Sequence, residues 1–242
     1  MRMGFRRRLR AALAGSLLLG GLATFSLATA SADAAVTPST TVTIPVNNAT
    51  VSGTRVLFDA GTSPMANSVL YQISGGGLTN HVIATATPTY YGWLALWNST
   101  SVPNGTYTLQ SVASFSGGLS ASSSPITITV NNPPPSTTVI IPSSGATMDT
   151  TKEVVWDAVA SPGVSAVSFE STANGVTETQ AATPTIYGWI AIISTGGPPC
   201  TGCIAFSFPI SIQSVASYSN GVTGTSPIVN ATLVLYLPPS II

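Results

Sequence analysis

The chain repeats itself, and this repeat limits the possible fold more than any other feature of the sequence. The segment STTVTIPVNNATV at 39–51 returns as STTVIIPSSGATM at 136–148. The segment LQSVASFSGG at 109–118 returns as IQSVASYSNG at 212–221. The matching blocks keep their order at an offset of 96 to 98 residues, which rises to 103 for the last pair. A repeat of about a hundred residues is the size of one small domain rather than of a solenoid unit.

The boundary between the copies is marked by NNPPP at 131–135. Consecutive prolines favour an extended and semi-rigid spacer. We therefore predict a first domain at 39–131, a linker at 132–135 and a second domain at 136–236.

Each copy reads as short alternating runs that Gly, Pro, Asn and Ser interrupt, without a helical period. About seven such runs in a hundred residues is typical of an immunoglobulin-like sandwich, so the sequence predicts an all-β protein of two such domains in tandem. In the first copy, three strands are expected to turn these residues to one face: Val56, Phe58 and Ala60; Val69, Tyr71 and Ile73; Tyr107, Leu109, Ser111 and Ala113.

The order of these blocks, with ATPT.YGW and PNGTYTLQSVAS..GG between the ends, resembles the bacterial Ig-like repeat domains of secreted and surface proteins. The resemblance covers nearly all of the chain beyond the first 38 residues, and the first copy matches better. The second copy has Ile210 where the first has Tyr107, and it carries an insertion, GGPPCTG. Such modules serve as spacers, adhesins and enzyme accessories, so the resemblance implies a fold and leaves the function open.

The N-terminus has the layout of a secretory signal peptide, predicted at 1–34. Five arginines in the first ten residues precede the apolar stretch AALAGSLLLGGLATFSLA, and small residues follow it. Cleavage is expected after Ala30, Ala32 or Ala34, and Ala34 is favoured. The alternative is an uncleaved membrane anchor, for which the apolar stretch is only marginally long.

Cleavage would leave two basic and six acidic residues, a net charge of −4. That charge excludes a basic surface for nucleic acid or anionic lipid. No later run is long enough to span a membrane. The C-terminal LYLPPSII has neither an LPxTG-type sorting motif nor a membrane tail. We expect a secreted, extracellular protein, either released or associated with the cell surface, whose partner is an extracellular protein or a glycan.

The repeated phrase TPTYYGWLALW at 87–97 and TPTIYGWIAII at 183–193 has two interpretations. Its aromatic side chains either stack on a sugar ring or form a core strand. Alternation places Trp93 with Ala95 and Trp97 on one face, which favours a core strand. The tyrosines precede the strand, where a hydroxyl can reach water, so the candidate ligand contacts are Tyr90, Tyr91 and Tyr187.

Groups for catalysis or for metal binding are scarce, so we predict no enzyme activity, no catalytic residue, no cofactor and no metal site. His81 is the one histidine and has no counterpart in the second copy. Asp157 and Glu170, the acids that resemble a glycosidase pair, are expected on different sheets. Asp59 and Asp157 are expected to accept backbone hydrogen bonds at a turn.

The two cysteines, Cys200 and Cys203, lie in the insertion of the second copy. A zinc ion would need two further ligands, and a redox site would need a helix start. In an oxidising compartment a local disulfide between them is expected, with two free thiols as the alternative.

These observations lead to two hypotheses. The first is a non-enzymatic secreted protein of two Ig-like domains, acting as a structural, adhesive or protein-interaction module. The second is a carbohydrate-binding accessory module that uses Tyr90, Tyr91 and their neighbours.

Overall fold

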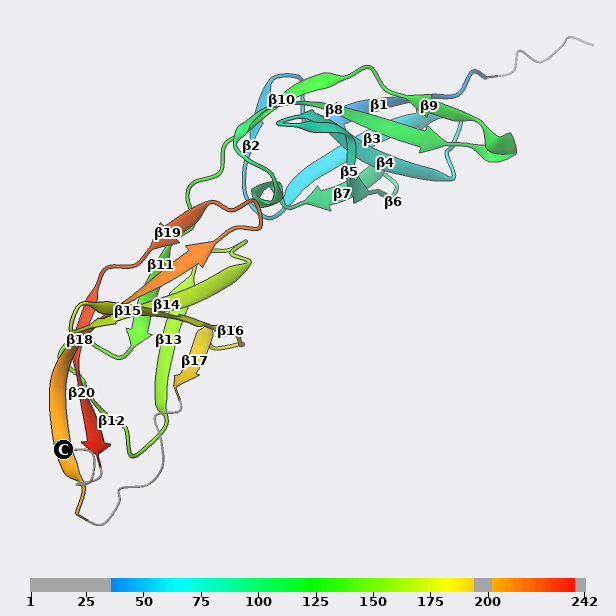
Figure 1. Ribbon diagram of the computed structural model, residues 1–242. Coiled ribbons are helices and arrows are strands. Elements are labelled where there is room, and N and C mark those ends of the chain that lie inside the picture. The colour runs from blue at the N-terminus through cyan, green and yellow to red at the C-terminus, as the bar shows by residue number, and fades with distance from the viewer. Residues whose placement is uncertain (1–35, 194–201, 238–242) are drawn as a thin grey trace, which may run out of the picture. The chain divides into compact units, whose positions relative to one another are not determined.

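The computed structural model describes residues 36–193 and 202–237. These residues form two pairs of β-sheets, one pair for each copy of the repeat (Figure 1). The two pairs have the same strand order, and each encloses its own hydrophobic cluster. The predicted all-β fold of two tandem immunoglobulin-like sandwiches is therefore confirmed.

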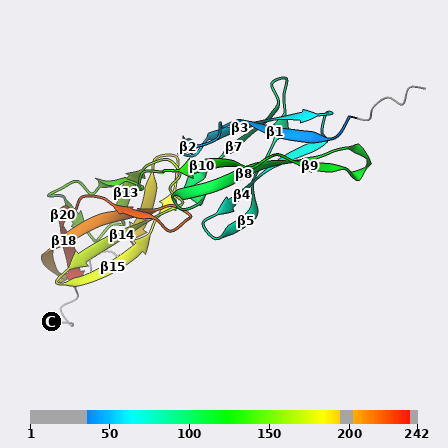
Figure 2. The same cartoon turned by 90° about the horizontal axis from the view of Figure 1, so that it is seen from above.

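The first sandwich has one sheet in the order β1-β3-β7-β6 and one in the order β2-β10-β8-β4-β5, with β9 paired to β8. Figure 2 shows β4, β5, β8 and β10 side by side in the second of these sheets. Two short 3-10 turns also occur, Ser99–Ser101 and Ser116–Gly118. The strands are β1 Ser39–Ile44, β2 Ala49–Val51, β3 Val56–Ser63, β4 Ser68–Gly75, β5 Leu78–Thr85, β6 Thr87–Pro88, β7 Trp93–Trp97, β8 Gly105–Ser114, β9 Ser120–Ser122 and β10 Ile126–Val130.

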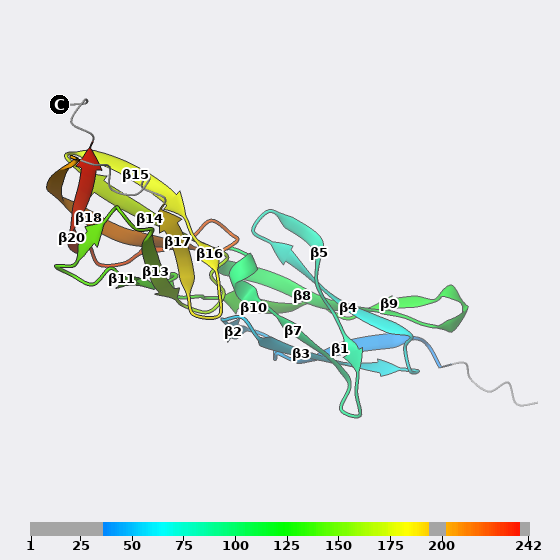
Figure 3. The same cartoon turned by 90° about the horizontal axis from the view of Figure 1, so that it is seen from below.

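The second sandwich repeats this plan with sheets β11-β13-β17-β16 and β12-β20-β18-β14-β15, and β19 pairs with β18. Its strands β13 and β17, and its strands β14 and β15, are followed most easily in Figure 3. The strands are β11 Thr137–Ile141, β12 Thr147–Asp149, β13 Val154–Ala160, β14 Ala166–Ala173, β15 Val176–Ala181, β16 Thr183–Pro184, β17 Trp189–Ile193, β18 Ile204–Ser217, β19 Thr223–Thr225 and β20 Val229–Leu237.

Seven strands in each sandwich are the main ones, as the sequence predicts; in the first they are β1, β3, β4, β5, β7, β8 and β10. The remaining three are short. One of them, β2, continues the first strand on the opposite sheet and runs parallel to β10. The chain crosses between sheets at the cis peptide bond before Pro45, since proline interrupts the ladder of β1 there.

Strand alternation places the core where the sequence predicts it. On β3, β4 and β8 every residue of the three predicted inward sets is buried. The ring of Phe58 lies 5.1 Å from that of Tyr71 and 5.8 Å from that of Trp97, measured between centroids, so aromatic side chains from both sheets meet.

A buried hydrogen bond joins the two sheets of each sandwich at equivalent positions. Thr40 of β1 and Ser111 of β8 share a bond of 2.8 Å between their hydroxyls, and Thr137 and Ser214 share one of 2.9 Å. Each hydroxyl thus has a partner in the core, which removes the cost of burying it alone. The small serines on β8 and β18 are therefore polar cross-links as well as space for the facing side chains.

The division into domains at 39–131, 132–135 and 136–236 stays a prediction. One observation refines it: Asn132, the first residue of the predicted linker, is buried in the first sandwich. Its carboxamide oxygen accepts from the Ser99 hydroxyl and from the Gly53 N–H, both at 2.8 Å.

The predicted signal peptide at 1–34, with its candidate cleavage points, lies outside the described residues. Among the residues that the structure describes, no helix has the length and apolar character needed to cross a membrane.

Candidate functional site

The candidate site begins at the turn between β6 and β7, where Thr89 holds the backbone. Its hydroxyl oxygen accepts from the N–H groups of Tyr91 and Gly92, both at 3.2 Å. The same hydroxyl donates to the carbonyl oxygen of Gly92 at 2.9 Å. Together with a 2.8 Å backbone bond from the Thr89 N–H to the Gly92 carbonyl oxygen, these side-chain bonds fix a four-residue turn. The two residues at its tip, Tyr90 and Tyr91, are consequently held away from the sheet.

The second copy builds the same turn between β16 and β17. The hydroxyl oxygen of Thr185 accepts from the N–H groups of Tyr187 and Gly188 at 3.1 and 3.2 Å, and it donates to the carbonyl oxygen of Gly188 at 2.9 Å. The tip residues here are Ile186 and Tyr187. We call these two segments, 89–92 and 185–188, the aromatic turns.

The tyrosine side chains of the aromatic turns stand in solvent. Tyr90, Tyr91 and Tyr187 are 97%, 82% and 77% exposed. The rings of Tyr90 and Tyr91 lie 5.4 Å apart, edge to face at 88°. A flat stacking platform needs two coplanar rings, whereas the rings of Tyr90 and Tyr91 are nearly perpendicular. The candidate contacts that the sequence predicts are accessible, but whether they bind anything stays a prediction.

The tryptophans beside the turns belong to the core, as the alternation of the strand predicts. Trp93 and Trp97 on β7 are buried. The carbonyl oxygen of Trp93 accepts a 2.6 Å bond from the hydroxyl of Tyr71, on the opposite sheet. Trp189 on β17 is only partly buried and packs at the edge of the second core.

A carboxylate lies beneath the glycine of each aromatic turn. A Cβ atom added to Gly92 would overlap Oδ1 of Asp59, and one added to Gly188 would overlap Oδ1 of Asp157. Both glycines also have positive φ angles, 144° and 150°. The glycines are required here because the turn passes directly over an acidic side chain.

The prediction that Asp59 and Asp157 occupy turns is wrong. Both lie inside strands, Asp59 in β3 and Asp157 in β13. Their carboxylates lie against the aromatic turns, beneath Gly92 and Gly188. The other carboxylate oxygen of Asp59, Oδ2, accepts a 2.8 Å bond from the hydroxyl of Thr43. The sequence does not distinguish the two cases, because an Asp-Ala pair after an alternating run can either begin a turn or continue the strand.

The outer face of the four-stranded sheet carries apolar side chains along β7 in the first copy and along β17 in the second, with polar residues beside them. In the first sandwich a groove of ≈ 360 Å³ follows β7, lined by Leu57, Leu94 and Leu96 among others. A groove of ≈ 490 Å³ follows β17 at the equivalent place, where Ile190 and Ile192 line it together with polar residues such as Gln180 and Thr183. Each groove adjoins the strand that the aromatic turn precedes.

The residues with catalytic character are not brought together. His81 is exposed on β5. Asp157 is on β13 and Glu170 on β14, which belong to different sheets as predicted. Oε2 of Glu170 accepts a 2.6 Å bond from the side-chain amide of Gln213. Within the described residues, no group of three or more His, Cys, Asp and Glu side chains is placed to hold a metal ion.

Cys200 lies outside the described residues, so the predicted disulfide with Cys203 stays a prediction. Among the residues that the structure describes there is no free cysteine.

Sequence reasoning missed the role of Thr89 and Thr185. The signal was present: a threonine three residues before a glycine, in TYYG and TIYG, is the spacing of a hydroxyl-capped turn.

No family model and no curated protein matches this chain. Among solved structures, it is similar to the fibronectin(III)-like modules of Clostridium thermocellum CbhA, at 15% identity and a TM-score of 0.30, over 80% of this chain and 92% of that one. It is also similar to a tetra-tandem repeat in the extending region of a large adhesion protein, at 18% identity and a TM-score of 0.33, over 84% and 49% of the two chains. A third similarity is to titin domains z1z2, solved in complex with telethonin, at 17% identity and a TM-score of 0.27, over 81% and 95%. Similarities this distant do not extend to function.

Proposed function

We propose that this chain is a non-enzymatic, secreted bacterial protein, whose two Ig-like domains act as a structural or adhesive protein-interaction module at or outside the cell surface. The observation that carries the proposal is the aromatic turn. It is built twice by the same threonine bonds, and each time it exposes a tyrosine. Exposed tyrosines on a fixed backbone supply contact area at a small cost in conformational entropy.

The apolar grooves along β7 and β17 support a protein partner. Exposed leucine and isoleucine side chains form patches on the outer sheet in both copies. Exposed apolar side chains gathered in a groove with polar neighbours are common in protein–protein contacts. Two equivalent sites on one chain would also bind a repetitive surface more strongly than one site does.

The placement of the polar groups supports a role without catalysis. A general acid or base must converge with other polar groups on a substrate. Here the histidine is exposed on an edge strand, and the two candidate acids occupy different sheets.

Carbohydrate binding is the second candidate, and the exposure of Tyr90, Tyr91 and Tyr187 favours it. The edge-to-face geometry of the tyrosine pair offers single ring faces rather than a platform for two sugar units. A glycan would therefore be bound weakly at each turn.

Retention assays distinguish the two candidates. The protein is passed over cellulose, chitin and peptidoglycan, and over an extracellular surface fraction before and after protease treatment. A protein-interaction module is retained by the untreated surface fraction and released when that fraction is digested. Retention on one of the polysaccharides, unchanged by protease, would make carbohydrate binding the better function.

A further inference from the structure

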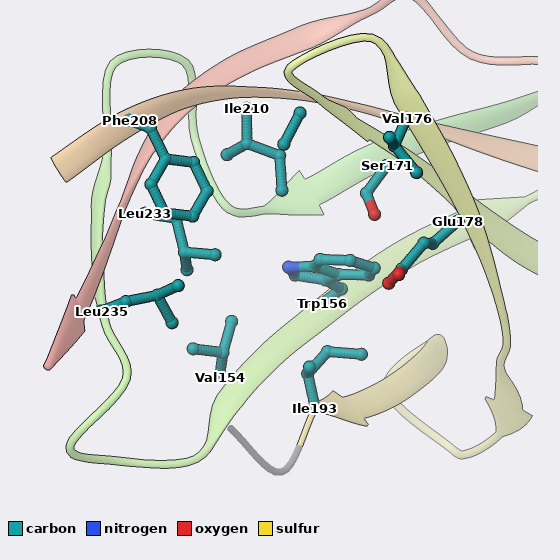
Figure 4. Close-up of a pocket in the computed structure, with 11 residues that line it drawn as sticks. Val154, Trp156, Ser171, Val176, Glu178, Ile193, Phe208, Ile210, Leu233 and Leu235 are labelled. Carbon is teal, nitrogen blue, oxygen red and sulfur yellow. The ribbon is translucent and has the colours of Figure 1, made fainter. Parts of the chain in front are cut away.

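The core of the second sandwich contains a pocket whose counterpart in the first sandwich is filled. Its volume is ≈ 340 Å³, and it opens between the two sheets (Figure 4). It is lined by side chains from both of them, among which are Val154, Trp156, Ser171, Ile193, Ile210 and Leu233.

One cause of the pocket is the loss of a tyrosine. In the first copy Tyr107 is buried, and its ring lies over the glycines that begin the β4–β5 turn: a Cβ on Gly75 would lie 3.1 Å from the ring. Its hydroxyl donates to the carbonyl oxygen of Pro103 at 2.8 Å. In the second copy Ile210 takes this place and Ala173 replaces Gly75, so the ring is absent and both residues line the pocket instead.

Two further replacements enlarge the space. Trp97, buried against Phe58, pairs in register with Val56, and its equivalent on β17 is Ile193, which pairs with Val154. Ile73 on β4 is fully buried, and its equivalent on β14 is Ser171. In each case the second copy has the smaller side chain, and the removed volume lies in one place.

The pocket contains a buried hydrogen-bond donor without a partner. Trp156 is only 5% exposed, and its indole Nε1 has no hydrogen-bond partner among the described residues. Figure 4 shows this nitrogen pointing into the pocket, toward the apolar side chains of β18 and β20. The equivalent residue in the first copy, Phe58, has no such group. An unpaired buried N–H costs free energy, and a ligand acceptor would recover it once a neighbouring side chain moves aside to expose the nitrogen, which has almost no accessible surface here.

The rim adds two more polar groups. Figure 4 shows the Ser171 hydroxyl directed into the pocket and the Glu178 carboxylate beside the far end of the Trp156 ring. Glu178 is exposed on β15, next to exposed Val176. A carboxylate at the rim repels an anionic ligand. The Ser171 hydroxyl can donate a hydrogen bond to a ligand or accept one from it.

We infer that the second sandwich binds a small, neutral, apolar molecule that carries one oxygen acceptor, a ketone, ester or ether, which receives the hydrogen bond of Trp156 Nε1–H. A cavity of about 150 Å³ lined by apolar side chains holds one benzene. The pocket is roughly twice as large, which suits a bicyclic ring or a chain of about ten heavy atoms.

The test uses three naphthalene probes of similar size and the full chain: 2-acetylnaphthalene with a ketone, 2-ethylnaphthalene without an acceptor, and 2-naphthoate with a negative charge. Binding is followed through the indole N–H signals in proton–nitrogen correlation spectra. The ketone is expected to bind saturably, to move the Trp156 signal, and to bind about tenfold more tightly than the hydrocarbon. The naphthoate is expected to bind more weakly than the ketone.

Three variants introduce the residue that the first copy has at the equivalent position. Trp156→Phe removes the N–H and is expected to abolish the preference for the ketone over the hydrocarbon. Ile193→Trp places a ring against Trp156, as Trp97 does against Phe58, and is expected to weaken both probes at least tenfold. Ser171→Ile fills the same space from the other sheet if Ile193→Trp does not fold. Trp189→Phe, which removes the other indole N–H of this sandwich, is the matched control and should leave the preference intact.

Four results would each overturn the inference. They are no saturable binding of either neutral probe, a ketone preference that survives in Trp156→Phe, unchanged binding in a folded pocket-filling variant, or naphthoate binding as tightly as the ketone.

Discussion

At the scale of single residues, glycine and aspartate are coupled at the aromatic turns. Gly92 has a φ angle of 144°, and a Cβ there would overlap the Asp59 carboxylate and come within 3.0 Å of the Ala60 carbonyl oxygen. We expect Gly92→Ala to destabilise the first domain by about 3 kcal/mol, because backbone strain and steric overlap act together. Chemical denaturation monitored by circular dichroism measures the loss.

Gly117 provides the matched control for this substitution. Its φ is 75°, and a Cβ there meets nothing within 4 Å. Gly117→Ala should cost only about 1 kcal/mol, the strain of a positive φ. Equal losses at the two glycines would show that the turn is free to move off the carboxylate.

Tyr71 links stability to alkaline pH. Burial first, and the Asp59 carboxylate second, raise the pKa of Tyr71 above its ordinary value of 10.0. The unfolded chain therefore releases this proton near pH 10 while the folded chain keeps it, so stability present below pH 10 is lost as the pH rises further.

Tyr71→Phe removes this pH dependence and mimics Phe169 of the second copy. At pH 7 the variant should lose about 1–2 kcal/mol, because the carbonyl oxygen of Trp93 loses its donor. The difference in free energy of unfolding between the variant and the wild-type protein should become smaller between pH 9 and 12, as measured by chemical denaturation at each pH. A difference in free energy that stays constant over that range would contradict the raised pKa of Tyr71.

At the scale of elements, β7 and β17 have the same register but different burial. Trp93 is buried, whereas Trp189 is only partly buried. We expect Trp93→Ala to destabilise the first domain by about 3–5 kcal/mol, the usual cost of deleting a buried large aromatic. Trp189→Ala should cost the second domain less, about 2 kcal/mol. A larger loss from Trp189→Ala than from Trp93→Ala, by thermal unfolding, would reverse this assignment.

The elements also show what sequence can predict. Alternation on β3, β4, β7 and β8 identified the inward residues, because a half-buried strand has a strict period of two. The repeat supplied the number of domains. Both the alternation and the repeat are properties of the chain itself, so they can be recognised from the sequence alone.

The features that the sequence does not predict depend on contacts between residues of strands that lie far apart in the chain. The replacement of Tyr107 by Ile210 was visible, but the pocket also requires Ile193 and Ser171, which join it only through sheet packing. The sequence predicts a turn at Asp157 for a similar reason, since only the pairing of β13 with β11 and β17 extends the strand past it.

At the scale of the whole molecule, export is the prediction that the N-terminus carries. Mature protein from a secreting host should begin between Ser31 and Val36, since the small-residue cleavage sites cluster there. N-terminal sequencing of the secreted form checks this. An intact Met1 in that form would contradict the signal peptide.

The most direct measurement of the proposed function is retention of a Tyr91→Ala, Tyr187→Ala double variant on the extracellular surface fraction. Both side chains are exposed, and the threonine bonds of the turns involve backbone groups, so the fold should be unchanged by circular dichroism. We predict a loss of retention of at least tenfold relative to the wild-type protein, because two sites fail together. Leu119→Ala, which removes an exposed apolar side chain outside both turns, is the control and should be retained like the wild-type protein. Undiminished retention of the folded double variant would contradict the assignment of the aromatic turns as the interaction site.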